Sequence, residues 1–476
     1  MQKMIKAACV LLTVLGAVAG TTPAAAQESG GELSFVDCGD GLRCAAMTVP
    51  SDWARPDSAR ITLGLAKLPA RDDARKRGVL VINLGGPQAQ ISAFRQPGLR
   101  DRFAELTELF DVVLFDPRGF EASSGIVCPL PAPAEADYVF PDQVAYEAHA
   151  DRNGRFGQEC APAAGPLAGK LNAWQVAHDL EAIRAALGER KLHYFGNSYG
   201  TVYAQAYLEL FPRRAGRMYL DSVMDHTNTS LPDWLGQRAA ANERSLHRFA
   251  DWCARESNCA LHGRDVLTVW DEVIDRAARQ PIPAPGAGPG STVSATQVVA
   301  RADVKSARRW PAFAAALAEA HAGDATKLAQ KLVFPPGPGA MRIATCADFP
   351  YPGDYHAVRT LETSLRAVAP RLGWRQAWIW AMNCARLPQA GTFPPHRPHF
   401  DGVPPVLIAG GEYDDNTPPE WGRHLAGQLP GARYLTAEGD HALYVDGNPC
   451  VRAHVHRYLT TGHLPPKNTT CAGALA

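Results

Sequence analysis

One pentapeptide, Gly196-Asn197-Ser198-Tyr199-Gly200, constrains the fold of this chain more than any other feature. It directly follows the apolar run from Leu192 to Phe195, which predicts a buried strand, and it precedes a helical pattern from Val202 to Leu210. A G-x-S-x-G sequence between a strand and a helix predicts a tight turn that holds the serine hydroxyl above a sheet edge. Ser198 is therefore the candidate nucleophile, and the amide of Tyr199 is a candidate donor to an oxyanion.

Short apolar runs alternate with helical patterns along much of the chain. A helix is expected from Trp174 to Leu187, where apolar residues recur at helical spacing. Strands separated by helices favour a parallel sheet with right-handed crossovers, so we predict an α/β protein with a mostly parallel central sheet. Besides the strand before Ser198, the expected strands are Val79 to Asn83, Val112 to Phe115, Met218 to Leu220, Val406 to Ala409 and Ala432 to Leu435.

The alternation breaks between about Asn228 and Arg397, where helical patterns dominate. We interpret this region as an inserted, mainly helical cap domain. Its expected helices are Trp234 to Cys253, Arg264 to Arg279 and Pro311 to Leu332, and its expected loops are Pro281 to Ser291 and Phe334 to Gly339. The predicted domains are residues 27–227 for the first part of the core, 228–400 for the cap, and 401–476 for the second part of the core with a C-terminal extension.

Residues 1–26 have the pattern of a signal peptide. Lys3 and Lys6 precede an apolar run from Ala7 to about Gly20, and Ala24-Ala25-Ala26 forms a small-residue cleavage site. The apolar run is too short to span a bilayer, so we expect cleavage rather than anchoring. The sequence thus predicts an exported protein, periplasmic or extracellular, with no membrane attachment after cleavage.

The cysteines also favour export. The chain has 11 cysteines, and without Cys9 an even number remains, which is typical of disulfides in an exported protein. The chain has neither a CxxC pair nor an HExxH sequence, so we expect no metal and no other cofactor. Pairing of sequential neighbours is the simplest arrangement, and it joins Cys38–Cys44, Cys128–Cys160, Cys253–Cys259, Cys346–Cys384 and Cys450–Cys471.

Composition argues against a nucleic-acid partner and against extensive disorder. With 48 Lys plus Arg against 48 Asp plus Glu, the chain has no basic excess to neutralise phosphates, so no nucleic-acid partner is expected. With 46% hydrophobic residues and no net charge, most of the chain is expected to be folded rather than disordered.

The partners of Ser198 are expected after the two late strands. A serine hydroxyl needs an adjacent base, and with this strand–turn–helix arrangement an acid and then a histidine follow the serine along the chain. Glu412, Asp414 and Asp415 come just after the first late strand, and each is a candidate acid. His441 comes just after the second late strand and is the predicted base, which the acid would orient.

The second oxyanion donor is expected in the loop after the early strand, Asn83-Leu84-Gly85-Gly86-Pro87. Glycine lets the backbone approach a substrate closely, whereas Pro87 has no N–H to donate. The amide of Gly86 or of Gln88 is therefore the candidate donor, and we choose Gly86.

The sequence resembles the secreted tripeptidyl-aminopeptidase branch of the α/β-hydrolases, in the same peptidase group as the prolyl aminopeptidases. The resemblance covers nearly the whole mature chain and implies an α/β-hydrolase fold with a helical cap. It selects Asp414 as the acid, because Asp414 with Thr417-Pro418 matches the D-x-x-T-P motif of the family. The other matching segments are Asp116-Pro117-Arg118-Gly119 with Ser123 and Cys128, Asp179 to Arg184, Ser198 to Thr201, the cysteines of the cap, and Gly462 to Pro465 between Cys450 and Cys471.

Three residues depart from the family pattern near the predicted site. Gln88 stands in a loop that usually continues with small residues, and Glu121 and Asp440 stand where the family usually has glycine. Gln88 and Glu121 are therefore our candidate substrate-binding residues. Asp440 would raise the pKa of His441 if its side chain points toward the imidazole.

The resemblance implies a serine exopeptidase that releases short peptides from free N-termini through an acyl-enzyme. Recognition of an ammonium group favours a carboxylate near the cleft, for which Glu121, Asp225 and the acidic residues of the insertion are candidates. A carboxylesterase would use the same triad without that carboxylate, and it is the alternative because the loop at Gln88 is altered. An intact order of serine, acid and histidine argues against a non-catalytic binding protein. The expected partner is thus a peptide or an ester substrate.

Overall fold

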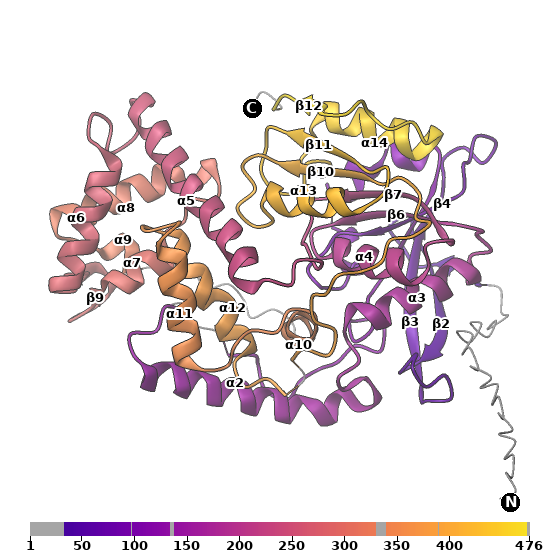
Figure 1. The fold of residues 1–476 in the computed structure, drawn as a ribbon, viewed down its shortest axis with the longest axis horizontal. Coiled ribbons are helices and arrows are strands. Elements are labelled where there is room, and N and C mark those ends of the chain that lie inside the picture. Colours follow the sequence, from indigo (N-terminus) through magenta and orange to yellow (C-terminus); the bar gives the residue numbers. More distant parts are fainter. Residues whose placement is uncertain (1–32, 97, 134–137, 330–338, 389, 474–476) are drawn as a thin grey trace, which may run out of the picture.

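The computed structural model describes residues 33–96, 98–133, 138–329, 339–388 and 390–473 (Figure 1). The predicted signal peptide, residues 1–26, and nearly all of the predicted loop at 334–339 lie outside the described residues. Within the described ranges, no helix is both long enough and apolar enough to cross a membrane.

A sheet of ten strands forms the centre of the core, in the order β1-β2-β3-β5-β4-β6-β7-β10-β11-β12. Its first strands are antiparallel, and from β5 to β12 every neighbouring pair is parallel. The mostly parallel sheet predicted from the sequence is confirmed. The bounds are β1 Val36–Asp37, β2 Arg43–Pro50, β3 Arg60–Leu68, β4 Val79–Asn83, β5 Asp111–Phe115, β6 Leu192–Asn197, β7 Ala215–Asp221, β10 Leu407–Gly411, β11 Arg433–Ala437 and β12 Thr470–Cys471.

The central strands are apolar along their whole length because helices cover both faces of the sheet. In β4, Val79 and Val81 pack into one core, whereas Leu80 and Ile82 pack into another. The first core includes residues of α3 (Ala173–Ala186), α4 (Gly200–Leu210) and α13 (Pro419–Gln428), and the second includes residues of α1 (Ile91–Phe94) and α14 (Pro449–Thr461). Continuous apolar runs therefore predicted these strands correctly, whereas β1 to β3, which are partly exposed, were missed.

The region inserted between β7 and β10 is mainly helical and lies to one side of the sheet (Figure 1). The expected single helix from Pro311 to Leu332 is wrong, because α8 ends before Gly323, whose φ of 108° places it in the left-handed region. Part of the expected loop at 281–291 pairs as β8 (Ile282–Pro283) with β9 (Thr292–Val293). The helices are α5 Leu231–Arg255, α6 Val266–Arg279, α7 Ala295–Arg301, α8 Trp310–Ala322, α9 Thr326–Ala329, α10 Gly339–Asp348, α11 Tyr355–Arg366 and α12 Gln376–Cys384.

One helix from the first part of the chain also belongs to the cap layer. Helix α2 (Gln143–Ala164) lies beside α11 and α12 in Figure 1. Asn153 donates hydrogen bonds from Nδ2 to the carbonyl oxygens of Asn383 (3.0 Å) and Ala385 (2.7 Å), in the last turn of α12 and just beyond its end. A division of the chain at residue 228 therefore leaves out a helix that buttresses the cap.

Five disulfides join the sequential neighbours: Cys38–Cys44, Cys128–Cys160, Cys253–Cys259, Cys346–Cys384 and Cys450–Cys471. These are the pairs of the simplest arrangement expected from the sequence. His454 lies with Cys450 and Cys471 in a group whose donor atoms are within 4.8 Å of one another. Because the two sulfurs are bonded to each other, they offer no thiolate to a metal ion.

Candidate active site

Ser198 stands on a strained turn between β6 and α4. Its φ of 53° is in the left-handed region, which a side chain other than glycine rarely adopts. The flanking glycines are required by close packing: a Cβ on Gly196 would lie 2.9 Å from the carbonyl oxygen of Gly200, and a Cβ on Gly200 would lie 2.6 Å from that of Asn83. The G-x-S-x-G pattern therefore reflects lack of space around a turn that lifts the Ser198 side chain off the sheet.

The structure brings His441 and Asp414 together at the ends of β11 and β10. The distance from His441 Nδ1 to Asp414 Oδ2 is 2.9 Å. Of the three carboxylates left open by the residue order alone, Asp414 is the one bonded to His441 in the described chain. Ser198 Oγ has no hydrogen bond to His441 among the described residues. Such contacts are often long before a substrate is bound.

Thr417 completes the hydrogen-bond shell of this pair. Its hydroxyl donates to Asp414 Oδ2 at 2.7 Å and lies 3.0 Å from His441 Nδ1. The other carboxylate oxygen of Asp414 accepts from the backbone N–H groups of Asn416 (2.9 Å) and Thr417 (2.8 Å). The Asp414 carboxylate is therefore fully bonded and held in one orientation.

The surroundings of this pair favour its charged forms. Burial alone would raise the pKa of Asp414, but His441 and the hydrogen bonds from Thr417 lower it below its ordinary value. Burial alone would lower the pKa of His441, but the charges of Asp414 and Asp221 and the hydrogen bond to Asp414 raise it above its ordinary value. An imidazole placed in this way is a good proton acceptor with a stabilised charged form.

The loop that carries His441 is fixed by the end of β7. The buried carboxylate of Asp221 accepts hydrogen bonds from the backbone N–H groups of Leu443 (3.3 Å) and Tyr444 (2.9 Å). The hydroxyl of Ser222 accepts from the N–H of Ala442 at 2.8 Å. Two residues that are distant in sequence thus hold the histidine loop, and the sequence analysis did not assign them this role.

Ser198 faces a cavity of about 300 Å³ between the core and the cap. This volume is at the lower end of the range typical of small-molecule sites. The N–H groups of Tyr199 and Gly86, which also line it, have no hydrogen-bond acceptor in the described part of the chain. The lining residues are Gly86, Ala132, Ser198, Tyr199, Met224, Arg238, Met341, Arg342, Thr345, Ile379, Trp380, Asn383, Asn416 and Thr417.

The glycine loop at this cavity is held by a buried glutamine. Gln90 donates from Nε2 to the carbonyl oxygens of Gly85 (3.0 Å) and Gln88 (2.7 Å), and its Oε1 accepts from the N–H of Leu84 (2.7 Å). Gly86 has a φ of 116°, and a Cβ there would lie 2.5 Å from the nitrogen of Gln88. Gln90, one of the residues that make this loop more polar than is usual in the family, thus holds the loop backbone in place through hydrogen bonds.

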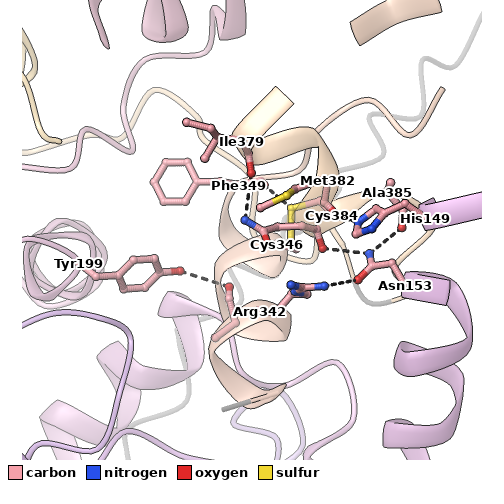
Figure 2. The surroundings of a disulfide bond; sticks show 12 residues. His149, Asn153, Tyr199, Arg342, Cys346, Phe349, Ile379, Met382, Cys384 and Ala385 are labelled. Atoms are coloured by element: carbon pink, nitrogen blue, oxygen red, sulfur yellow. Dashed lines mark hydrogen bonds between the residues drawn. A yellow bond between two sulfur atoms is a disulfide. The ribbon is translucent and has the colours of Figure 1, made fainter. Parts of the chain in front are cut away.

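The cap wall of the cavity is built by α10 and α12, which the Cys346–Cys384 disulfide joins (Figure 2). Tyr199 reaches this wall, where its hydroxyl donates to Asp348 Oδ2 at 2.6 Å. Burial raises the pKa of Asp348 to about 8, although the hydrogen bonds from Tyr199 and Ala173 lower it in part. The residue after Ser198 is therefore bonded directly to the cap.

Comparisons with known proteins agree with this geometry. Residues 79–272 match the family model of the alpha/beta hydrolase fold, and residues 369–471 match that of the TAP-like proteins. A tripeptidyl aminopeptidase of Streptomyces lividans is 29% identical over 95% of this chain and 89% of its own length. The serine protease Hip1 of Mycobacterium tuberculosis (strain ATCC 25618 / H37Rv) is 30% identical over 98% of this chain and 95% of its own length. The chain belongs to the TAP-like α/β-hydrolases.

A third relative is named as an esterase. The carboxylesterase B of Mycobacterium tuberculosis (strain CDC 1551 / Oshkosh) is 30% identical over 90% of this chain and 86% of its own length. All three relatives are hydrolases by name, and the fold agrees with them. The present chain is therefore a serine hydrolase of a peptidase-type family.

The residues that depart from the family pattern are not gathered at the cavity of this TAP-like hydrolase. Glu121 is exposed and accepts a hydrogen bond from Ser92 Oγ at 3.0 Å, and neither Glu121 nor Gln88 lines the cavity. Asp440 lies 3.5 Å from Arg248 Nη1 rather than against the imidazole, so the raised pKa of His441 comes from Asp414 and Asp221 instead.

Asp225, the other candidate for binding an ammonium group, is bonded within the protein. Its buried carboxylate accepts from the N–H of Thr227 at 2.8 Å and pairs with His424 Nδ1 at 2.5 Å. None of the described residues that line the cavity is acidic, whereas Arg238 and Arg342 are basic. Arg238 could not be predicted as a cavity residue from the sequence, because an arginine within a long helical pattern carries no local signal of a cavity.

Proposed function

We propose that this chain is a serine exopeptidase that releases short peptides from free N-termini. The observation that carries the proposal is the cap-covered cavity of about 300 Å³ above Ser198, because it has room for a short segment and not for a folded protein. The relatives named as a tripeptidyl aminopeptidase and a serine protease support the same reading.

In the proposed reaction, Ser198 Oγ attacks the scissile carbonyl carbon and His441 Nε2 takes the hydroxyl proton. Asp414 holds Nδ1 of the imidazole and stabilises its charged form. The leaving amine takes the proton from His441 and departs, which leaves an acyl-enzyme. A water molecule then loses a proton to His441 and attacks the ester carbon. The bond to Ser198 Oγ breaks, Oγ takes the proton back from His441, and the acid product leaves.

The negative charge on the substrate oxygen develops near two backbone donors. Tyr199 and Gly86 line the cavity with Ser198, and their N–H groups have no acceptor among the described residues. Donors that are already fixed stabilise the tetrahedral intermediate without reorganising during the reaction. We assign the oxyanion hole to these two groups.

We also propose that the enzyme is exported. Five disulfides support this proposal, because such bonds form and persist in oxidising compartments outside the cytosol. The expected compartment is the periplasm or the medium.

A carboxylesterase is the second candidate. Two observations favour it: one relative is named carboxylesterase B, and no described residue of the cavity lining is a carboxylate that would bind a substrate ammonium. Ester cleavage needs only the triad and the oxyanion donors.

A matched hydrolysis assay separates the two candidates. We would compare tripeptide anilides with free and acetylated N-termini, alongside short-chain nitrophenyl esters, and use Ser198→Ala as the blank. Cleavage that requires the free amine is expected for the exopeptidase. Ester cleavage without anilide turnover would replace it with the esterase, and turnover by Ser198→Ala equal to the wild type would exclude Ser198 as nucleophile.

A further inference from the structure

Arg238 places a positive charge in the wall of the cavity. It belongs to α5, its side chain is 5% exposed, and it lines the same cavity as Ser198. The other basic residue of the wall, Arg342, donates to Asn153 Oδ1 (2.8 Å) and to the carbonyl oxygen of Pro133 (2.7 Å). Arg238 differs from Arg342, because its Nε is buried without a hydrogen-bond acceptor among the described residues.

The contacts of Arg238 leave its charge without an anionic partner. Its Nη2 donates to the neutral side chain of Asn416 at 2.7 Å, and its guanidinium lies 4.9 Å from the ring centroid of Trp380. Its Nε is buried and has no hydrogen-bond acceptor in the described part of the chain. Within the same described residues, no carboxylate oxygen lies within 4.0 Å of its nitrogens.

The nearest acidic residues form no ion pair with Arg238. Asp414 is bonded to His441 and Thr417, and Asp415 attracts the guanidinium without forming an ion pair with it. Burial lowers the pKa of Arg238, against the attraction of Tyr351 and these carboxylates. A buried charge of this kind is costly unless a partner of opposite charge completes it.

We propose that Arg238 binds a carboxylate of the substrate inside this cavity, so that the enzyme prefers acidic substrates. A guanidinium carries paired N–H groups that match the two oxygens of a carboxylate, and the Arg238 guanidinium lies over the ring of Trp380. The proposal deepens the proposed function and rests on it, since it places part of a peptide in the cavity. The carboxylate belongs either to an acidic side chain in the acyl part or to the free C-terminus of a short peptide.

Paired substrates distinguish these two sources. The first set consists of tripeptide anilides with a free N-terminus that carry Glu or Gln at one of the three positions. The second set consists of short peptides that end in a free carboxylate or in an amide. For the correct source, kcat/KM of the acidic member is expected to exceed that of its neutral partner about 10- to 100-fold, which is the range for a hydrogen bond to a charged group.

Three variants test whether Arg238 causes that preference. Arg238→Gln is expected to bring the acidic-to-neutral ratio close to one, mainly through KM, and Arg238→Lys is expected to keep part of it. Arg244→Gln is the matched control, because Arg244 lies on the same helix but pairs with Glu420 at 3.2 Å and does not line the cavity. The ratio of two substrates on one variant is insensitive to a general loss of activity.

The outcomes keep this inference separate from the proposed function. If anilides are cleaved but no preference for acidic substrates depends on Arg238, the inference is overturned, whereas the proposed exopeptidase activity still stands. If anilides are not cleaved, the comparison is repeated with nitrophenyl hemisuccinate against nitrophenyl butyrate, where an Arg238-dependent preference would support the anionic subsite in an esterase.

A binding measurement needs no turnover. Calorimetry on the Ser198→Ala protein compares the dissociation constants of tripeptides that differ only by Glu or Gln, with and without Arg238→Gln. Tighter binding of the acidic peptide that disappears with Arg238→Gln is expected, and equal binding of both peptides by the unaltered cavity would overturn the proposal.

Discussion

Replacing Thr417 by valine would remove one hydroxyl from the centre of the proposed triad and leave nearly the same volume. That hydroxyl donates to Asp414 Oδ2 at 2.7 Å and lies 3.0 Å from His441 Nδ1. A hydrogen bond to a charged group contributes about 1.5–3 kcal/mol. Because Asp414 must stay charged while His441 accepts a proton, we expect most of this loss to appear in the transition state.

The expected result for Thr417→Val is a fall in kcat/KM of roughly 10- to 100-fold, since about 1.4 kcal/mol corresponds to a factor of ten. KM should change less than kcat, because Thr417 acts through Asp414 and His441 rather than on the substrate. Asp414 keeps its bonds from His441 and from two backbone N–H groups, so the protein should remain folded.

Steady-state kinetics across pH and thermal unfolding would be measured for Thr417→Val and for the control Thr417→Ser. The serine variant retains a hydroxyl and should recover most of the activity. A valine variant that is folded and works within twofold of the wild type would refute the reasoning that Thr417 positions the pair.

Two further predictions concern pH and the turn around the nucleophile. Because the pKa of His441 is raised above 6.5 and catalysis needs its neutral form, kcat/KM should fall with acid along a limb whose midpoint lies above 6.5; a midpoint below 6 would contradict this. The pairing of charged His441 with Asp414 stabilises the folded protein most at a pH below the pKa of His441 in the unfolded chain. This stabilisation is lost as pH rises through the raised pKa of His441 in the folded protein. Urea unfolding at several pH values would detect the loss. Gly200→Ala should lower kcat about 100-fold by displacing Ser198, because its Cβ would lie 2.6 Å from a backbone oxygen. Gly236→Ala, in open space on α5, should leave kcat unchanged, and equal effects of the two changes would argue against a steric cause.

The cap is connected to the catalytic loops as well as covering them. Asn242 of α5 donates from Nδ2 to the carbonyl oxygen of Asp415 at 2.9 Å, one residue after the proposed acid. Tyr199 donates to Asp348 Oδ2 on the cap side at 2.6 Å, one residue after the proposed nucleophile. Movement of the cap would therefore act on both the loop of Asp414 and the proposed oxyanion donor Tyr199.

Much of the core could be predicted because its signals are local. All six expected strands occur, and Val79–Asn83 has the predicted bounds, since a strand buried on both faces is a continuous apolar run. The helix expected from Pro311 to Leu332 failed at Gly323, where one residue in the left-handed region ends α8. Strands β1 to β3 were missed because partly exposed strands carry no continuous apolar run.

By itself, the sequence determined the strand–turn–helix around Ser198, the order in which an acid and a histidine follow it, and the even set of cysteines, because each is a pattern of neighbours along the chain. The tertiary structure decided which groups meet: Asp414 with His441, Tyr199 with Asp348 across 149 residues, and Arg238 with Asn416 across 178. It also decided that the cavity carries an unpaired guanidinium and no described carboxylate. Such contacts depend on which strand ends lie side by side in the sheet and on how the cap packs against them, and no local pattern encodes these distances.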